Sequence, residues 1–365
     1  MTRCATPEGT TRFSARFAGR AAAEHFRTAQ NLKWSSIGIG TYLGNPDPAT
    51  DESYSAAVVA AVRGGINVID TAINYRFQRS ERSIGAALKQ LAAEGFAREE
   101  LILCTKGGYL TPDGQMPWNP SDYFRQEFIA RGVMRSEEVA AGCHCMSPGY
   151  LDNQLTRSLR NLGVDCVDVY YLHNPETQLG EVPREEFDRR LRAAFEFLES
   201  AVTAGRIRFF GIATWNGFRA APHAADYLPL DSIAALARDV AGEGHHFRVI
   251  QFPFNLAMPE ALVQRNQSVA GRACPALVAA EAQGVTAVAS ASILQGRLAS
   301  NLPPGVREVF RLESDLLRAI QFTRSTPGIT TALVGMSRAA HVAENLKLAA
   351  LAPATLEQFE KLFGE

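Results

Sequence analysis

The amino-acid sequence predicts an α/β protein that folds as a (β/α)8 TIM barrel, with an N-terminal arm and long βα loops over the C-terminal mouth. Short apolar runs of strand character alternate with amphipathic helical segments, which indicates βα units around a parallel sheet. The chain has 365 residues and 46% hydrophobic content, which suits a barrel of this size. Polar residues also close several of the apolar runs, where barrel enzymes place their chemistry.

Eight strands are expected in chain order, each a short run rich in β-branched and aliphatic residues. Their ranges are 36–41, 67–71, 101–106, 166–173, 207–213, 248–254, 286–291 and 331–335. Seven amphipathic segments between them are expected to be helices. These are 52–63, 81–93, 152–162, 185–203, 233–241, 276–283 and 309–324. We therefore expect residues 1–33 to form the arm and residues 34–365 to form the barrel.

A doubly wound Rossmann sheet is the competing architecture. It would need a Gly-x-Gly-x-x-Gly turn between the first strand and its helix. The early glycines Gly38, Gly40 and Gly44 lead instead into Asn-Pro-Asp-Pro. The barrel is therefore favoured.

Two connections are longer than ordinary βα loops, at 107–148 and about 256–273. Loops beyond about 12 to 15 residues are usually lids, binding loops or disorder. The first is rich in aromatic residues, which favours an ordered lid over disorder. We expect Trp118, Tyr123 and Phe128 in this loop, and Trp215 elsewhere, to be candidates for the walls of a substrate pocket.

Composition narrows the classes of function. With 37 basic and 38 acidic residues, the chain shows no basic footprint for nucleic acid or an anionic membrane. No stretch approaches the ~18 apolar residues that span a bilayer, and no signal-peptide core is visible. A cytoplasmic protein with a small-molecule partner is expected, although the Ala- and Arg-rich first 33 residues leave a transit segment open. The six cysteines are scattered, and no structural disulfide is expected.

Four residues supply the parts of an acid–base site. Tyr75 is a weak acid on its own, but a nearby ammonium favours its phenolate and so lowers its pKa. Lys106 would provide that ammonium, and Asp70 would keep it charged and oriented. His173, as a neutral imidazole, could donate a hydrogen bond that polarises a carbonyl. Taken singly, these residues could instead be a helix cap, a rim aromatic, a surface lysine and a core histidine.

The residues around this quartet resemble the aldo-keto reductase superfamily from about Leu32 to the C-terminus. The resemblance rests on the segments 35–42, 65–75, 80–85, 101–106 and 155–173. The family's catalytic tetrad of aspartate, tyrosine, lysine and histidine falls on Asp70, Tyr75, Lys106 and His173. The resemblance implies a barrel that binds NADPH, or less often NADH, reduces aldehydes or ketones or runs the reverse oxidation, and needs no metal.

The same resemblance implies a set of cofactor-binding positions, several of which depart from the family's usual residues. They are Gly40, Thr41, Thr214, Gln251, Ser290, Ile293, Gly296, Gly335, Ser337, Arg338, His341, Glu344 and Asn345. Ala213-Thr214 replaces the usual Ser-Asn pair, and Ser290 replaces an aromatic that stacks on the nicotinamide in many relatives. Gly335-Met336 and His341 stand where relatives often grip the 2'-phosphate, with Arg338 nearby. NADP(H) is favoured slightly over NAD(H).

Two alternatives stay open. The altered positions leave room for a nucleotide-binding regulatory subunit with little turnover, as in the potassium-channel β-subunit branch of the family. Cys143-His144-Cys145 contains zinc-ligand types, but its spacing is short and no fourth ligand is evident, so no metal is expected. Substrate identity and oligomeric state are not specified by the sequence.

Overall fold

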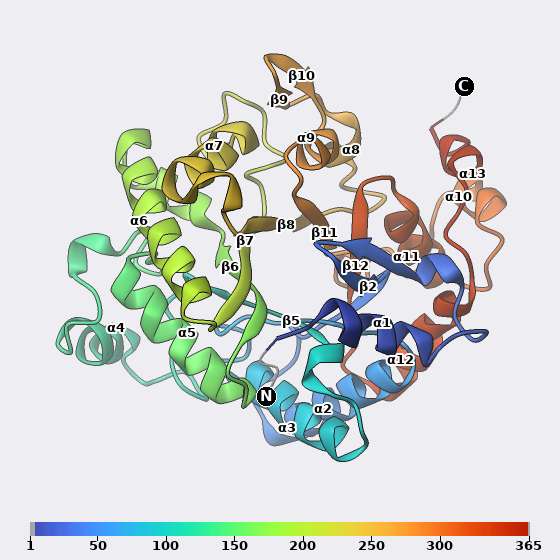
Figure 1. The fold of residues 1–365 in the computed structure, drawn as a ribbon, viewed down its shortest axis with the longest axis horizontal. Helices are drawn as coiled ribbons and strands as arrows, with labels where there is room; N and C mark the ends of the chain where they lie inside the picture. Colours follow the sequence, from blue (N-terminus) through green and yellow to red (C-terminus); the bar gives the residue numbers. More distant parts are fainter. Residues whose placement is uncertain (1–3, 364–365) are drawn as a thin grey trace.

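The computed structural model describes residues 4–363, and it confirms the predicted barrel. Eight parallel strands close in the order β11-β12-β3-β4-β5-β6-β7-β8 (Figure 1). Their bounds are β3 Ile37–Gly40, β4 Val68–Asp70, β5 Ile102–Gly107, β6 Val167–His173, β7 Ile207–Ala213, β8 Phe247–Pro253, β11 Thr286–Ser290 and β12 Ile329–Gly335. Each predicted strand is therefore present, with shifts of one or two residues at the ends.

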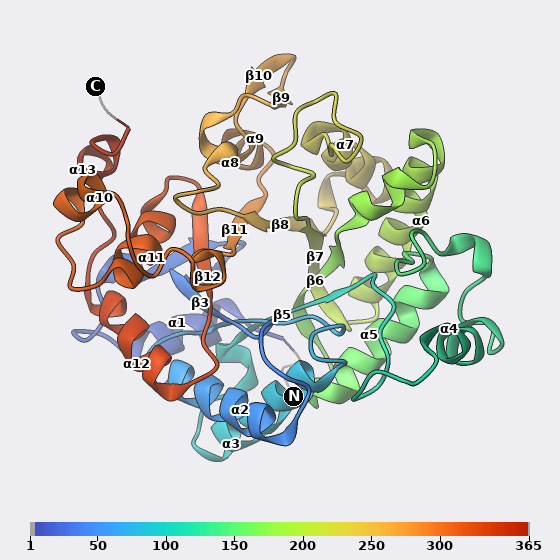
Figure 2. The ribbon, with the colours of Figure 1, turned by 180° about the vertical axis from the view of Figure 1, so that it is seen from behind.

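Helices surround the barrel, as Figures 1 and 2 show from opposite faces. They are α2 Pro48–Arg63, α3 Arg79–Ala93, α5 Pro148–Leu162, α6 Arg184–Thr203, α7 Leu230–Ala241, α9 Ala276–Ala282, α10 Pro304–Val309, α11 Asp315–Ser325, α12 Ala339–Leu346 and α13 Leu356–Glu360. The helix predicted at 309–324 begins too early. Ser314 is the N-cap of α11, and its side chain accepts a hydrogen bond from the Leu317 amide, so the chain breaks between α10 and α11.

The N-terminal arm packs on the floor of the barrel. It contains α1 (Pro7–Ala15) and the antiparallel hairpin of β1 (Phe26–Ala29) with β2 (Leu32–Ser35). Leu32 and Trp34 are fully buried and belong to the apolar cluster that fills the barrel's interior. The arm therefore plugs the floor, while the other end stays open. The first three residues of the predicted arm lie outside the described residues.

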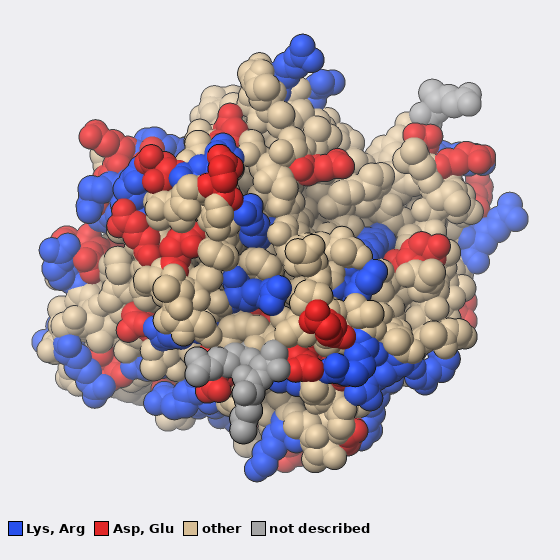
Figure 3. All heavy atoms as spheres, viewed as in Figure 1, with Lys and Arg blue, Asp and Glu red and all other residues tan. Residues whose placement is uncertain are grey.

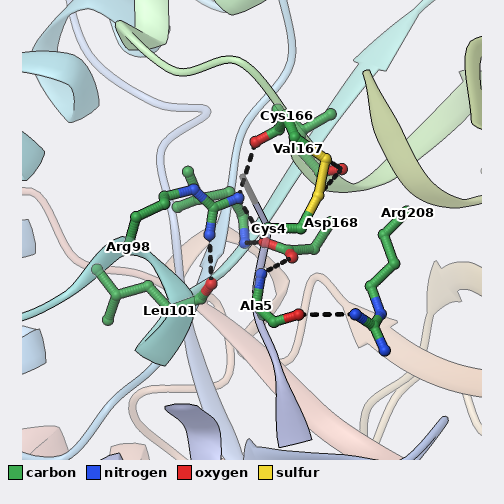
Figure 4. The surroundings of a disulfide bond; sticks show 9 residues. Cys4, Ala5, Arg98, Leu101, Cys166, Val167, Asp168 and Arg208 are labelled. Carbon is green, nitrogen blue, oxygen red and sulfur yellow. Dashed lines mark hydrogen bonds and ion pairs between the residues drawn. A yellow bond between two sulfur atoms is a disulfide. The ribbon is translucent and has the colours of Figure 1, made fainter. Parts of the chain in front are cut away.

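The expectation of no structural disulfide is wrong. Cys4 of the arm is joined to Cys166, the residue immediately before β6, with their Cα atoms 5.5 Å apart (Figure 4). The Asp168 carboxylate fixes the arm beside β6, because it accepts hydrogen bonds from the Ala5 amide at 2.6 Å and from Arg98 at 2.7 Å. The two cysteines are 162 residues apart in sequence, so only the docking of the arm brings them together.

The loop at 107–148 is ordered but lies mostly beside the barrel. It contains α4 (Pro120–Phe124), which sits at the outer edge of the molecule in both Figures 1 and 2. Phe128 packs in a small core of its own with Met134, Cys145 and Tyr150. Trp118 is fully exposed. Most of this loop therefore packs beside the barrel, and only the segments near its two ends adjoin the strand ends at the mouth.

The second long connection holds α8 (Glu260–Val263) and the hairpin of β9 (Gln267–Val269) with β10 (Arg272–Cys274). On the face shown in Figure 3, basic and acidic side chains are interspersed. No helix within residues 4–363 is long and apolar enough to cross a membrane. In the same residues, no group of three His, Cys, Asp or Glu side chains is placed to hold a metal ion.

Candidate active site

Three neighbouring strands bring the predicted quartet together. Asp70 ends β4, Lys106 lies next to the end of β5, and His173 ends β6, while Tyr75 follows β4 in its loop. The Lys106 ammonium donates to Asp70 Oδ1 at 2.5 Å, to the Thr71 carbonyl at 2.8 Å and to the Tyr75 hydroxyl at 3.3 Å. The four residues lie together because the carboxyl ends of parallel strands meet at one rim of the barrel.

Burial and charge oppose each other in this cluster. Burial alone would lower the pKa of Lys106, but the charges of Asp70 and Tyr75 raise it above its ordinary value, so the ammonium stays protonated. Burial also raises the pKa of Asp70, against the effect of Lys106. As expected, the charge and hydrogen bond of Lys106 lower the pKa of Tyr75. Burial is the larger effect, so the net pKa of Tyr75 is raised and the hydroxyl stays protonated at neutral pH.

His173 presents a neutral imidazole beside Tyr75. The two ring centroids are 5.8 Å apart, with the planes at 75°. Burial, and then the Lys106 charge, hold the pKa of His173 well below its usual value. Its Nδ1 is buried and has no hydrogen-bond partner within the described residues. A neutral ring next to a protonated tyrosine is an arrangement that can bind and protonate a carbonyl oxygen.

A cavity of about 790 Å³ opens above the quartet, and Asp70, Tyr75 and His173 line it. Lys106 lies beneath this surface, with its side chain almost wholly buried. Eleven of the predicted cofactor-binding residues also line the cavity. They are Gly40, Thr41, Thr214, Gln251, Ser290, Ile293, Gly296, Gly335, Ser337, His341 and Asn345.

Residues 36–235 match the model of the aldo/keto reductase family. The chain belongs to this family. The sequence is similar to the aldo-keto reductase YhdN of Bacillus subtilis, with 31% identity over 188 residues that cover 51% of this chain and 45% of the relative. It is also similar to the NADH-specific methylglyoxal reductase of Escherichia coli, with 27% identity over 203 residues covering 54% and 52%. The chain thus spans about half the length of these relatives.

Solved structures of aldo-keto reductases share the fold over nearly the whole chain. AKR11C1 from Bacillus halodurans, in its holo form, has a TM-score of 0.62 and 20% identity, covering 93% of this chain and 94% of that one. An aldo/keto reductase from Klebsiella pneumoniae in complex with NADP and acetate has a TM-score of 0.60 and 18% identity, covering 93% and 94%. At these identities the likeness concerns the fold alone.

Two of the predicted cofactor-binding residues lie away from the cavity wall. Arg338 is exposed at the N-cap of α12 and makes no ion pair within the described residues. The Glu344 carboxylate accepts from the Ser314 hydroxyl at 3.1 Å. By contrast, Asn345 is buried, lines the cavity, and has an Oδ1 atom without a partner within residues 4–363. Its side chain is thus available to a ligand.

Thr214 lines the cavity, but its hydroxyl is occupied. It donates to Glu176 and accepts from the Gly217 amide at 2.7 Å. The same Glu176 oxygen accepts from the Trp215 amide at 2.9 Å. Burial raises the pKa of Glu176, while these donors lower it. Sequence reasoning missed Glu176, because its role depends on the contact between the loops that follow β6 and β7.

Several cavity-lining residues were not predicted as site residues. Tyr42, Tyr109 and Asn174 line the cavity near Tyr75 and His173. Each lies within two residues of the end of a barrel strand, and that position was the signal that could have found them. Among the four aromatic residues proposed as pocket walls, Trp215 lines the cavity, whereas Trp118, Tyr123 and Phe128 do not.

Proposed function

We propose that this chain is an NAD(P)H-dependent reductase that transfers hydride reversibly between a nicotinamide and an aldehyde or ketone, with Tyr75 as the general acid and base. The observation that carries the proposal is the Tyr75 hydroxyl, which lies in the cavity 3.3 Å from the Lys106 ammonium, itself 2.5 Å from Asp70. This is the relay that a carbonyl reduction needs at the developing alkoxide. The substrate is a small-molecule carbonyl or the corresponding alcohol.

The bound nicotinamide would supply the hydride. In the reduction direction, Tyr75 gives its proton to the carbonyl oxygen as negative charge develops there, and Lys106 stabilises the phenolate that remains. Asp70 balances the ammonium from the far side. His173 donates a hydrogen bond to the same oxygen and orients the carbonyl. In alcohol oxidation the phenolate takes the proton back.

The residues present fit a nicotinamide dinucleotide. Gln251 donates to Asp70 Oδ2 at 2.8 Å, which leaves its amide oxygen as the acceptor for a carboxamide N–H. At the other end, the unpartnered Oδ1 of Asn345 is suited to an adenine amine. Because the Thr214 hydroxyl is already hydrogen-bonded, Thr214 would only form part of the cavity wall against the nicotinamide. The regions between these two ends are lined by Ser290, Ile293 and Gly296.

We keep NADP(H) ahead of NAD(H). The relatives differ in the cofactor that their names give. A relative from Schizosaccharomyces pombe has NADP(+) in its name, whereas the Escherichia coli relative is named as NADH-specific. Here Met336 is fully buried and cannot contact a phosphate, which leaves Arg338 and His341 as the 2'-phosphate partners. A guanidinium carries a permanent charge and a planar set of donors that match a phosphate, which an imidazole does not. Arg338→Ala should therefore weaken NADPH binding about tenfold while changing NADH binding less than twofold, measured by fluorescence titration. Equal effects on both nucleotides would refute this role.

The function itself is tested with Tyr75→Phe. NADPH oxidation is followed at 340 nm with methylglyoxal and 4-nitrobenzaldehyde as probes. Loss of the hydroxyl should lower kcat at least ~100-fold while cofactor affinity stays within severalfold, because only the proton donor is removed. Turnover that survives this change would refute the assignment.

A regulatory subunit that binds nucleotide with little turnover is the second candidate. Ala213-Thr214 and Ser290, which depart from the family's usual residues around the nicotinamide, favour it. Tight NADPH binding by the wild type, without turnover of any probe, would support it. Turnover that Tyr75→Phe abolishes would exclude it.

A further inference from the structure

The Cys143-His144-Cys145 segment lies directly behind the candidate catalytic histidine. His144 is fully buried, and its Nε2 lies 2.8 Å from the backbone carbonyl oxygen of His173. Because a carbonyl oxygen only accepts, Nε2 carries the proton in this contact. The His144 side chain therefore holds the backbone of the residue whose ring faces the cavity.

A second hydrogen bond fixes this tautomer. The Gln178 amide nitrogen donates to His144 Nδ1 at 2.9 Å, so Nδ1 is the acceptor. Arg190 in turn donates to the Gln178 amide oxygen at 2.6 Å, which orients the amide. Burial lowers the pKa of His144 to about 4, so the ring is neutral near neutral pH, as both hydrogen bonds require.

His144 also contacts His173 indirectly, through the ring of Tyr109. The Tyr109 ring stands between two imidazoles, with centroids 5.3 Å from His144 and 5.1 Å from His173, and meets both nearly edge-on. Asn174 donates to the Tyr109 hydroxyl at 3.1 Å. The ring of His173 is thus supported by Tyr109, and its backbone by His144.

Gly108 shows how close this packing is. A Cβ atom at this position would lie 2.7 Å from His144 Nε2 and 3.1 Å from the His173 carbonyl oxygen. Its φ of +141° is also one that other residues rarely adopt. The backbone of the first long loop thus approaches the pair of histidines at a point that only glycine permits.

We propose that His144 is a positioning residue for His173: it sets the backbone and ring of His173 so that the imidazole meets the carbonyl oxygen. This rests on the proposed reductase function. It gives the Cys143-His144-Cys145 segment a role that involves no metal. Replacing His144 should therefore affect the chemical step through His173, and should leave cofactor binding unchanged.

The test compares His144→Leu, which removes the donor, with His144→Gln, whose amide nitrogen can reach the Nε2 position. With 4-nitrobenzaldehyde as the probe, we expect His144→Leu to lower kcat/KM about tenfold or more. His144→Gln should recover to within about threefold of the wild type, with the NADPH Kd within about twofold for both variants. A loss that is equal in the two variants would overturn the proposal.

A double-mutant cycle separates positioning from general structure. In a His173→Ala background, His144→Leu should change kcat/KM less than about twofold, because the residue it acts through is gone. An equal fold loss in both backgrounds would overturn the proposal. If His144→Leu does not fold, Gln178→Leu replaces it in the same cycle, with a smaller loss expected that again vanishes without His173. Wild-type protein without turnover would overturn the proposed function, and this inference with it; an active wild type matched by His144→Leu would overturn the inference alone.

Discussion

Replacing Lys106 by methionine isolates the charge that the proposed mechanism depends on. The ammonium lies 3.3 Å from the Tyr75 hydroxyl, and at an effective dielectric near 20 two unit charges at that distance interact by roughly 5 kcal/mol. If about half of the phenolate charge has developed in the transition state, the variant loses about 2.5 kcal/mol, or roughly 70-fold in rate. We therefore expect kcat for 4-nitrobenzaldehyde to fall about 100-fold, with NADPH affinity within severalfold.

Lys106→Met should also shift the pH profile of alcohol oxidation in a defined direction. In the proposed mechanism alcohol oxidation needs the Tyr75 phenolate, and Lys106 lowers the pKa of Tyr75 against the larger effect of burial. Removing the ammonium raises that pKa further, so the pH at which oxidation reaches half of its maximum should move upward. Lys89→Met, on the exposed face of α3, is the matched control and should change neither the rate nor the profile.

The variant also leaves a buried carboxylate without its cation. Breaking one side of a buried ion pair costs about 3–5 kcal/mol in stability, so the midpoint of urea unfolding should fall. Asp70→Asn combined with Lys106→Met should recover part of this stability and none of the activity. A kcat within fivefold of the wild type, in a folded variant that binds NADPH, would refute the assigned role of Lys106.

Two further predictions concern stability away from the chemistry. Cys4→Ser opens a loop that spans 162 residues and should lower the free energy of unfolding by about 2–5 kcal/mol with little change in kcat. Cys143→Ser, at a half-buried free thiol, is the control and should change stability much less. Equal denaturation midpoints for wild type and Cys4→Ser would contradict this. His25 is buried with its pKa lowered from 6.5 to about 4, so the folded state binds fewer protons than the unfolded state between these values, and stability should fall as pH drops through this range. His25→Asn should flatten that slope in urea titrations at pH 7 and pH 4.5, and an unchanged slope would count against the assignment.

The strands and the quartet could be predicted because both follow from local patterns. Asp70 and His173 each end an apolar run, Lys106 lies one residue before the end of another, and parallel strands in a barrel bring such ends to one rim. That rule needs no knowledge of loop paths. It also explains why Tyr42, Tyr109 and Asn174, which sit just beyond strand ends, reach the cavity.

Residues that depend on contacts between loops could not be predicted in this way. His144 lies in an irregular segment and Glu176 in a short 3-10 helix between strands, and nothing in their spacing distinguishes them from exposed loop residues. Their burial comes from the docking of separate connections on each other. Cys4 and Cys166 present the same difficulty on the floor of the barrel, where the path of the arm decides the pairing.

The backbone that carries Tyr75 also escapes sequence rules. Arg76, Phe77 and Gln78 follow it with φ values of 50°, 57° and 73°, and none of them is glycine or asparagine, the residues that usually adopt this conformation. Such a turn costs roughly 1–2 kcal/mol per residue and persists only where its surroundings compensate. Arg76 is almost fully buried and pairs with Asp51, and Gln78 donates to the Pro112 carbonyl at 3.1 Å. Tertiary contacts, rather than local propensity, therefore hold the turn beside the proposed proton donor, which is how a strained segment at a reaction centre is maintained.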